Sequence, residues 1–293
     1  MLKYLMYSLI SDLLVLSISV LFLSLSTMSL NVTIKTWNTL HLFHEVNYVF
    51  ENSYVLEKYN IKRDPMRELL RIEDIVKILK KELGTNTVIC LQEVSGDLFE
   101  ELVRQNFCAV FHKEMDDVPS IYQDDDHLER LIFKSIYANC KEYQVVLVSN
   151  DLKDRIKSFR TILFTADDSK GAVVVEFDDF VVVGTHIPWN DTKRIQSLKQ
   201  IFEDVSFVKP FIVAGDFNRE HDKLVKDLVD VPLRFASKVN VHTFQIIRDG
   251  VVENELIDHV LVFCKDEFNF KGSVSVREDD KVSDHRLVSI EFA

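Results

Sequence analysis

Eight polar side chains stand beside short apolar runs and are of types that take part in catalysis. They are Asn38, Glu93, His186, Asp216, Asn218, Asp258, Asp284 and His285. Carboxylate and amide oxygens bind hard divalent cations, and imidazoles exchange protons or donate hydrogen bonds near neutral pH. If the fold gathers these side chains, they form a site able to bind a metal ion and a phosphate group.

The neighbouring apolar runs predict β-strands, which give a catalytic group a rigid position. The runs cover residues 32–37, 87–91, 180–185, 211–214, 256–263 and 287–292. The first is rich in β-branched residues, and the second is continuously apolar, as in a strand buried on both faces. Because a small displacement of a catalytic group costs a large factor in rate, strand ends suit this role.

Helices are predicted between the strands. In residues 66–83, Leu69, Ile72 and Leu79 recur at helical spacing, and Gly84 marks the end. Further helices are expected at residues 194–205 and 222–228, and further strands at residues 143–149 and 171–177. Three arginines near one face of the first helix are expected to be solvated, namely Arg63, Arg67 and Arg71. Many strands with few helices favour two packed sheets with flanking helices.

Composition and charge limit the classes of function. The chain has 293 residues, of which 47% are hydrophobic and 28% charged, as in a globular protein with one catalytic domain. Its formal net charge of -12 argues against binding nucleic acid through a broad basic surface. An acidic chain can still act on phosphate esters, because bound divalent cations are then the largest charges in the site.

The four cysteines predict neither a zinc site nor a disulfide framework. They are Cys90, Cys108, Cys140 and Cys264, and none has C-x-x-C or Cys/His spacing. Cys90 lies inside an apolar run, which favours a buried free thiol.

The first 30 residues form a separate segment with two interpretations. Residues 13–30 carry no charge, and together with the apolar stretch before Asp12 they are long enough to cross a bilayer. The first interpretation is membrane association through residues 4–30, with a catalytic domain at 31–293. The second is that translation starts at Met28 and gives a soluble intracellular protein. The sequons at Asn31 and Asn190 would permit glycosylation only in a secretory compartment.

Six short motifs in order resemble those of the endonuclease/exonuclease/phosphatase superfamily. They are TWN at 36–38, LQEV at 91–94, GTH at 184–186, GDFN at 215–218, IDHV at 257–260 and SDH at 283–285. The superfamily includes exonuclease III-like abasic endonucleases, deoxyribonuclease I and tyrosyl-DNA phosphodiesterase. Each motif alone means little, but six in matching strand contexts are specific. The resemblance covers residues 31–293 and implies an α+β fold, a four-layer α/β/β/α sandwich of two packed mixed sheets with flanking helices.

The resemblance also implies roles for the eight residues. Asn38, Glu93 and Asp284 would bind Mg²⁺, for which Mn²⁺ could substitute. Asp216 and Asn218 would orient or deprotonate the attacking water. His285, held by Asp258, would act as general base or as a cationic donor to the phosphate, and His186 would contact a phosphate oxygen. The general base is thus left open between Asp216 and His285. A lone histidine is more often structural than catalytic, and His259 stays unassigned.

The motifs leave the class of substrate open. The favoured hypothesis is a Mg²⁺-dependent phosphodiesterase that cleaves nucleic acid or processes DNA ends. Candidate nucleic-acid contacts follow the His186 strand, namely Trp189, Lys193, Arg194 and Gln196. The alternatives are a sphingomyelinase-like or inositol-phosphate enzyme, supported by the hydrophobic segment, and an inactive binding module of the same fold. A monomer is the default expectation.

Overall fold

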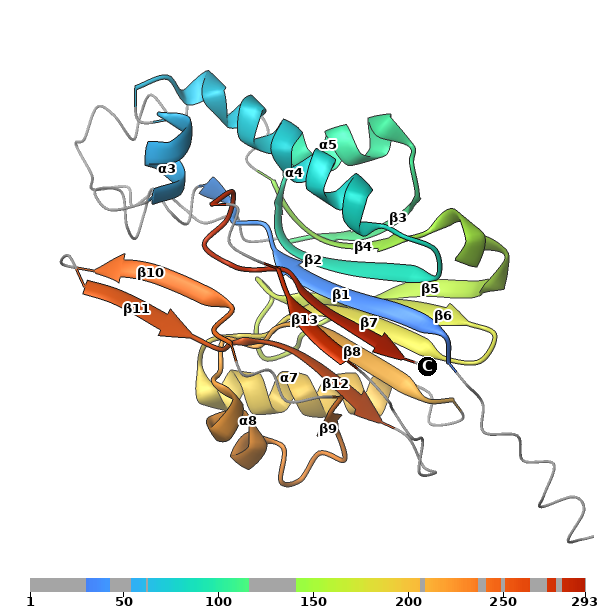
Figure 1. The fold of residues 1–293 in the computed structure, drawn as a ribbon. Helices are drawn as coiled ribbons and strands as arrows, with labels where there is room; N and C mark the ends of the chain where they lie inside the picture. Colours follow the sequence, from blue (N-terminus) through green and yellow to red (C-terminus); the bar gives the residue numbers. More distant parts are fainter. Residues whose placement is uncertain are drawn as a thin grey trace, which may run out of the picture.

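The fold is seen in a computed structural model of the chain (Figure 1). It describes residues 30–42, 54–61, 63–115, 141–205, 209–236, 241–248, 251–263, 273–277 and 281–292. Its helices and helical turns are α3 (Tyr54–Tyr59), η1 (Pro65–Arg67), α4 (Glu68–Glu82), α5 (Gly96–Gln105), η2 (Asn150–Arg155), α7 (Asp191–Asp204) and α8 (His221–Asp227).

The strands form two mixed sheets of six strands each and a separate hairpin. The first sheet has the order β13 (Ser273–Val276), β14 (Val288–Phe292), β1 (Val32–Asn38), β2 (Thr87–Ser95), β4 (Glu142–Val148) and β3 (Ala109–Glu114). The second has the order β5 (Ile156–Leu163), β6 (Gly171–Phe177), β7 (Val181–His186), β8 (Phe211–Asp216), β12 (Asp258–Phe263) and β9 (Arg234–Phe235). The hairpin consists of β10 (Phe244–Arg248) and β11 (Val251–Glu255). β1 runs parallel to β2, and β7 runs parallel to β8.

Three apolar clusters separate four layers, as the family resemblance implies. In β2, Ile89 and Leu91 face α4 and α5, whereas Val88 and Cys90 face the second sheet. The third cluster lies between the second sheet and the helices α7 and α8. Helices therefore cover the outer face of each sheet (Figure 1). Because every central strand is buried on both faces, the strand sequences are apolar almost throughout rather than alternating.

The predicted elements match those of the structure closely, but several further elements were not predicted. The predicted strand at 171–177 has the observed bounds of β6, and the helix predicted at 66–83 is α4. The elements that were not predicted include α5, the edge strands β3, β5, β9 and β13, and the hairpin. Edge strands are covered on one side only and carry many polar residues, so their apolar signal is weak. Cys90 and Cys108 are buried free thiols, and Cys140 and Cys264 lie outside the described residues.

The predicted membrane segment, except for Leu30, lies outside the part of the chain that the structure describes. Residues 1–29 belong to this undescribed part. Among the described residues, no helix is long and apolar enough to span a membrane. A membrane helix in residues 4–30 therefore stays a prediction.

The expectation that Arg71 is solvated was wrong. Its side chain is 1% exposed and forms a two-bond ion pair with Glu68, at 2.7 Å through Nε and 2.6 Å through Nη2. The same guanidinium donates to the backbone oxygens of Thr39, Leu40 and Val282, at 2.8 Å each. Arg71 thus joins α4 to the chain after β1 and to the chain before Asp284. Its five donors explain why a charged group is stable here.

We expect Arg71→Met to lower the free energy of unfolding by about 3–5 kcal/mol, because it leaves the buried Glu68 carboxylate without its partner. Arg104→Met is the matched control: Arg104 pairs with Glu101 at the same i,i+3 spacing, but its side chain is 71% exposed. The loss there should be at most about 1 kcal/mol. Urea unfolding of both variants measures the difference, and equal losses would contradict a structural role for the Arg71 ion pair.

Candidate active site

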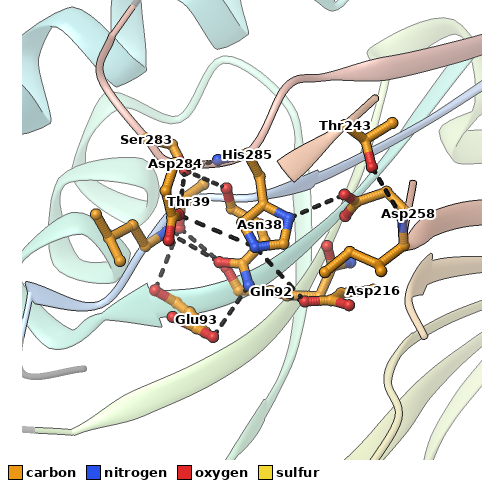
Figure 2. A network of polar contacts seen from close by, with 12 residues as sticks. Asn38, Thr39, Gln92, Glu93, Asp216, Thr243, Asp258, Ser283, Asp284 and His285 are labelled. Carbon is orange, nitrogen blue, oxygen red and sulfur yellow. Dashed lines mark hydrogen bonds and ion pairs between the residues drawn. The ribbon is translucent and has the colours of Figure 1, made fainter. Parts of the chain in front are cut away.

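The strand registers bring the polar strand ends together. In the second sheet His186 pairs with Asp216, and Asp216 pairs with Asp258, so three predicted site residues lie side by side. In the first sheet Asn38 pairs with Gln92, next to Glu93. The ends of β1 and β2 meet those of β7 and β8, and a network of polar contacts fills this junction (Figure 2).

Asn38 connects the two sheets. Its Nδ2 donates to Glu93 Oε1 at 3.0 Å and to Asp216 Oδ2 at 3.2 Å. Its Oδ1 accepts from the backbone N–H of Leu40 at 3.0 Å. With 1% of the residue exposed, the amide is buried and has partners on both sides. The orientation of Asn38 therefore fixes the separation of the two carboxylates.

Glu93 stands in a left-handed backbone conformation, with φ of 52°. The pairing of β2 with β4 shifts register between Leu91 and Val94, so Glu93 lies in a bulge. A bulge redirects the side chain it carries, and a left-handed non-glycine residue costs of the order of 1–3 kcal/mol. The redirected carboxylate accepts from Asn38 and, through Oε2, from the backbone N–H of His41 at 3.2 Å.

Asp216, Asn218 and His186 form the second-sheet side of the site. The backbone N–H of Asn218 donates to Asp216 Oδ1 at 2.8 Å, and Asn218 Nδ2 lies 3.0 Å from His186 Nε2. His186 Nε2 is also 3.6 Å from Asp216 Oδ2. A Cβ on Gly215 would lie 1.9 Å from the backbone oxygen of Thr185, so only glycine allows β7 and β8 to approach this closely beside Asp216.

His285 and Asp258 form a buried imidazole–carboxylate pair. His285 Nδ1 lies 2.9 Å from Asp258 Oδ2, and both side chains are at most 4% exposed. Thr243 Oγ1 accepts from the backbone N–H of Asp258 at 3.1 Å and holds the start of β12. His285 Nε2 points to Asp216 Oδ2 at 3.8 Å and to Asp284 Oδ1 at 4.0 Å (Figure 2). Nε2 of the imidazole therefore faces the carboxylates of Asp216 and Asp284.

The segment with Asp284 is fixed by Ser283. Ser283 Oγ donates to the backbone oxygen of Asn38 at 2.7 Å and accepts from the backbone N–H of His285 at 3.1 Å. Trp37 Nε1 donates to the backbone oxygen of His285 at 3.1 Å. The end of β1 thus holds the SDH segment directly.

Burial and neighbouring charges shift the pKa values of these groups. Burial raises the pKa of Asp216 to about 7, with the charge of His285 opposing the shift and that of Asp258 adding to it. Burial likewise raises the pKa of Asp284 to about 6. The charge of His285 opposes this shift, and the charge of Glu93 adds to it. For His285, burial alone would lower the pKa, but the carboxylates of Asp258, Asp284 and Asp216 outweigh it and hold the pKa well above its ordinary value.

The donor set fits a divalent cation. Asp216, Asp258 and His285 offer ligand atoms that all lie within 4.8 Å of one another and form a candidate metal site. Within the described residues, Asp258 Oδ1 is buried without a hydrogen-bond partner. Glu93 and Asp284 add two more carboxylates, so the acidic groups outnumber the cationic His285. An oxygen-rich, negatively charged site suits a hard cation such as Mg²⁺.

The predicted nucleic-acid contacts differ in their exposure. Trp189 is 77% exposed, and Gln196 is also exposed. Arg194 was wrongly predicted as a contact: it is 0% exposed, donates to the backbone oxygen of Trp189 at 2.8 Å and pairs with Asp227 at 3.1 Å. Lys193 pairs with Asp167 at 3.0 Å. Of these four side chains, Trp189 and Gln196 are exposed and thus open to a ligand, whereas Arg194 is not.

Sequence reasoning missed several residues that organise the site. Thr243, Ser283 and Lys170 contact Asp258, His285 and His186 respectively. Ser283 belongs to the SDH motif and could have been found from it, whereas Thr243 and Lys170 lie in no motif. The unassigned His259 is a core residue: burial lowers its pKa to about 4, and its Nε2 lies 2.8 Å from the backbone oxygen of Arg219.

The profile of the Endonuclease/Exonuclease/phosphatase family matches residues 36–285, which include all eight site residues. The chain belongs to this family. No curated protein matches the chain. The family fold together with the buried Asp/His cluster indicates a phosphoesterase site.

Solved structures share the fold at low sequence identity. D. rerio TDP2 complexed with single strand DNA product is 13% identical, with a TM-score of 0.58 and coverage of 89% of this chain and 98% of that chain. The human Nocturnin catalytic domain with bound sulfate anion is 17% identical, with a TM-score of 0.56 and coverage of 89% and 93%. An endonuclease/exonuclease/phosphatase from Bacteroides vulgatus is 16% identical, with a TM-score of 0.59 and coverage of 89% and 99%.

Without divalent cations, we expect the stability of the wild-type chain to fall from about pH 4 to about pH 7 more steeply than that of Asp216→Asn. The folded-state pKa of Asp216 is about 7 and its ordinary value is 3.8, so over this interval the folded protein keeps a proton that the unfolded chain releases. The associated stability is complete below the ordinary pKa and is lost as pH rises through the folded pKa. Asparagine binds no such proton.

Urea unfolding in EDTA across this pH interval measures the difference between the two proteins. Adding Mg²⁺ at the upper end should restore stability in the wild-type chain, because the cation replaces the proton. If the two pH profiles run parallel, Asp216 is already ionised in the metal-free protein.

Proposed function

We infer that this protein is a Mg²⁺-dependent phosphodiesterase that acts on nucleic acid, with processing of DNA ends as the favoured activity. The observation that carries this proposal is the junction at Asn38, where carboxylates from both sheets meet the His285–Asp258 pair. A buried group of acids with one cationic imidazole suits a reaction in which charge develops on phosphate oxygens.

Glu93, Asn38 and Asp284 would hold the magnesium ion. The Glu93 carboxylate is directed into the junction by its bulge, and Asn38 lies within hydrogen-bond distance of it. The alternative ligands Asp258 and His285 already share a hydrogen bond of 2.9 Å, which direct ligation through these atoms would break. A bound Mg²⁺ would neutralise phosphate charge and lower the pKa of a bound water.

Asp216 is the favoured general base, and His285 the favoured cationic donor. A base works best when its pKa lies near the working pH, and burial brings that of Asp216 to about 7. The raised pKa of His285 keeps the imidazole charged near neutrality, so it donates rather than accepts. Asp216 would take the proton of the attacking water while His285 donates to a phosphate oxygen.

Two observations favour nucleic acid among phosphate esters. D. rerio TDP2, which shares the fold, was solved with single strand DNA product. In this chain the exposed Trp189 follows the His186 strand, and aromatic rings stack on unpaired bases irrespective of sequence. The net charge of -12 is compatible with this proposal if the metal ion and a few stacked bases, rather than a basic surface, supply the affinity.

The full-length protein should hydrolyse at least one nucleic-acid substrate in Mg²⁺ and lose this activity in EDTA. His285→Ala should lower kcat by about 10²–10³, the usual effect of removing one transition-state donor. Glu93→Gln should raise the Mg²⁺ concentration for half-maximal activity by at least about tenfold, since even groups that only orient a metal ligand contribute this much. Steady-state assays over a magnesium series measure both effects.

Matched controls separate these effects from general damage. His112→Ala removes a histidine of β3 that packs on Phe99, and Glu176→Gln changes a glutamate of β6 that pairs with Lys209. Both should keep wild-type activity. The substrate panel should contain single- and double-stranded DNA, abasic DNA, 5′-tyrosyl DNA, RNA, sphingomyelin and inositol phosphates. Turnover of a lipid or inositol phosphate alone would replace the nucleic-acid proposal, and activity unaffected by EDTA would refute the metal-dependent mechanism.

A further inference from the structure

Lys170 lies outside the motifs but contacts a residue of the site. Its Nζ is 3.1 Å from His186 Nδ1 and 3.9 Å from Glu142 Oε1. The Lys170 side chain is 17% exposed and that of Glu142 is 4% exposed, so this contact is largely shielded from water. An ammonium group has three hydrogens and no lone pair, so it can only donate. A hydrogen bond from Lys170 therefore requires Nδ1 of His186 to be the acceptor.

The backbone around Lys170 is held in place from both sides. The N–H of Lys170 donates to the backbone oxygen of Asp167 at 3.2 Å, which closes a turn before β6. The next residue, Gly171, pairs with His186 in the antiparallel register of β6 and β7. A Cβ on Gly171 would lie 2.6 Å from the backbone oxygen of Ile162, so glycine allows β5 to pack closely at this point. The backbone of Lys170 is therefore fixed beside His186.

The other ring nitrogen of His186 faces the site. Nε2 lies 3.6 Å from Asp216 Oδ2, 4.0 Å from Glu93 Oε1 and 3.0 Å from Asn218 Nδ2. A neutral imidazole has one N–H and one acceptor nitrogen, so Lys170 and Asn218 cannot both donate to it. The bond from the charged Lys170 is about twice as strong as one from a neutral amide. Asn218 Nδ2 also donates to the backbone oxygen of Ile187 at 3.0 Å and thus has another partner.

We propose that Lys170 is a positioning residue that sets the tautomer of His186. By donating to Nδ1 it places the single ring hydrogen on Nε2, where it points toward Asp216 and Glu93. In this tautomer, Nε2–H of His186 can donate to a phosphate oxygen of a substrate bound at the junction of the two sheets. Without Lys170, the amide of Asn218 donates to Nε2, the hydrogen moves to Nδ1, and this donor is lost. The tautomer rests on the contacts of His186 with Lys170 and Asn218 and on the greater strength of the charged hydrogen bond, whereas the phosphate acceptor rests on the proposed function.

The tautomer can be measured without a substrate. Full-length protein labelled with ¹⁵N-histidine shows in long-range ¹H–¹⁵N correlation spectra which ring nitrogen carries the hydrogen, and His186→Gln identifies the His186 signals among the nine histidines. We expect Nε2–H in the wild-type chain and in Lys170→Arg, and a change to Nδ1–H in Lys170→Met. The matched control is Lys199→Met, which removes a half-exposed lysine of α7 that pairs with Asp230. Hydrogen on Nδ1 in the wild-type chain, or an unchanged tautomer in Lys170→Met, would overturn the proposal.

A double-mutant cycle tests the consequence for catalysis. Lys170→Met should lower kcat by roughly 10–100-fold with a smaller change in KM, as for other groups that orient a catalytic imidazole. In a His186→Ala background the same substitution should have an effect of less than about twofold, and Lys170→Arg should recover most of the rate. An undiminished loss in that background would show that Lys170 contacts the substrate directly and would refute the positioning role. If no substrate is turned over, the proposed function fails, while the spectra still decide the tautomer.

Discussion

The amide of Asn38 is the contact on which the geometry of the site depends. It is the hydrogen-bonded link between a carboxylate of the first sheet, Glu93, and one of the second, Asp216. The apolar core between the sheets holds them together by close packing. The hydrogen bonds of Asn38 add a defined distance and direction between the two carboxylates at the edge where the reaction would occur. Ser283, which donates to the backbone oxygen of Asn38, extends the restraint to the SDH segment.

The carboxylates at this junction repel one another, and the positive charge of His285 offsets this repulsion only in part. Asp216 and Asp284 respond by taking up protons more readily, and His285 responds by holding its proton more tightly. Burial is the main cause of the two carboxyl shifts and neighbouring carboxylates add to it, whereas the carboxylates raise the pKa of His285 against the effect of burial. A divalent cation would relieve the excess of buried negative charge directly. The same charges that destabilise the empty site therefore favour binding of a metal ion.

The positions of the candidate site residues could be predicted from the sequence better than their surroundings, for a physical reason. Asn38 and Asp216 end β1 and β8, and Glu93 follows the apolar run at 87–91 within β2, and the apolar composition of a strand is a local property. Arg71 and Arg194 could not be placed, because a charged side chain is normally solvated and becomes buried only when distant groups supply its partners. The acceptors of Arg71 include Thr39 and Val282, 32 and 211 residues away. The helix α5 is a different case: Ser95 caps it by accepting from Leu98, a local signal that could have been read.

The two buried arginines perform the same task on opposite sides of the molecule. Arg71 of α4 donates to backbone oxygens in the segments that carry Asn38 and Asp284, and Arg194 of α7 donates to that of Trp189, just after His186. These segments leave the sheets and lose the ladder partners of their carbonyl groups, which are costly to bury unpaired. A guanidinium has five donors, so it can bind carbonyl oxygens and a carboxylate at once. Arg71 pairs with the buried Glu68, and Arg194 pairs with Asp191 and Asp227. Each helical layer thus restrains the loops beside the site. The site residues at the strand ends are therefore held in place from both sides of the sandwich.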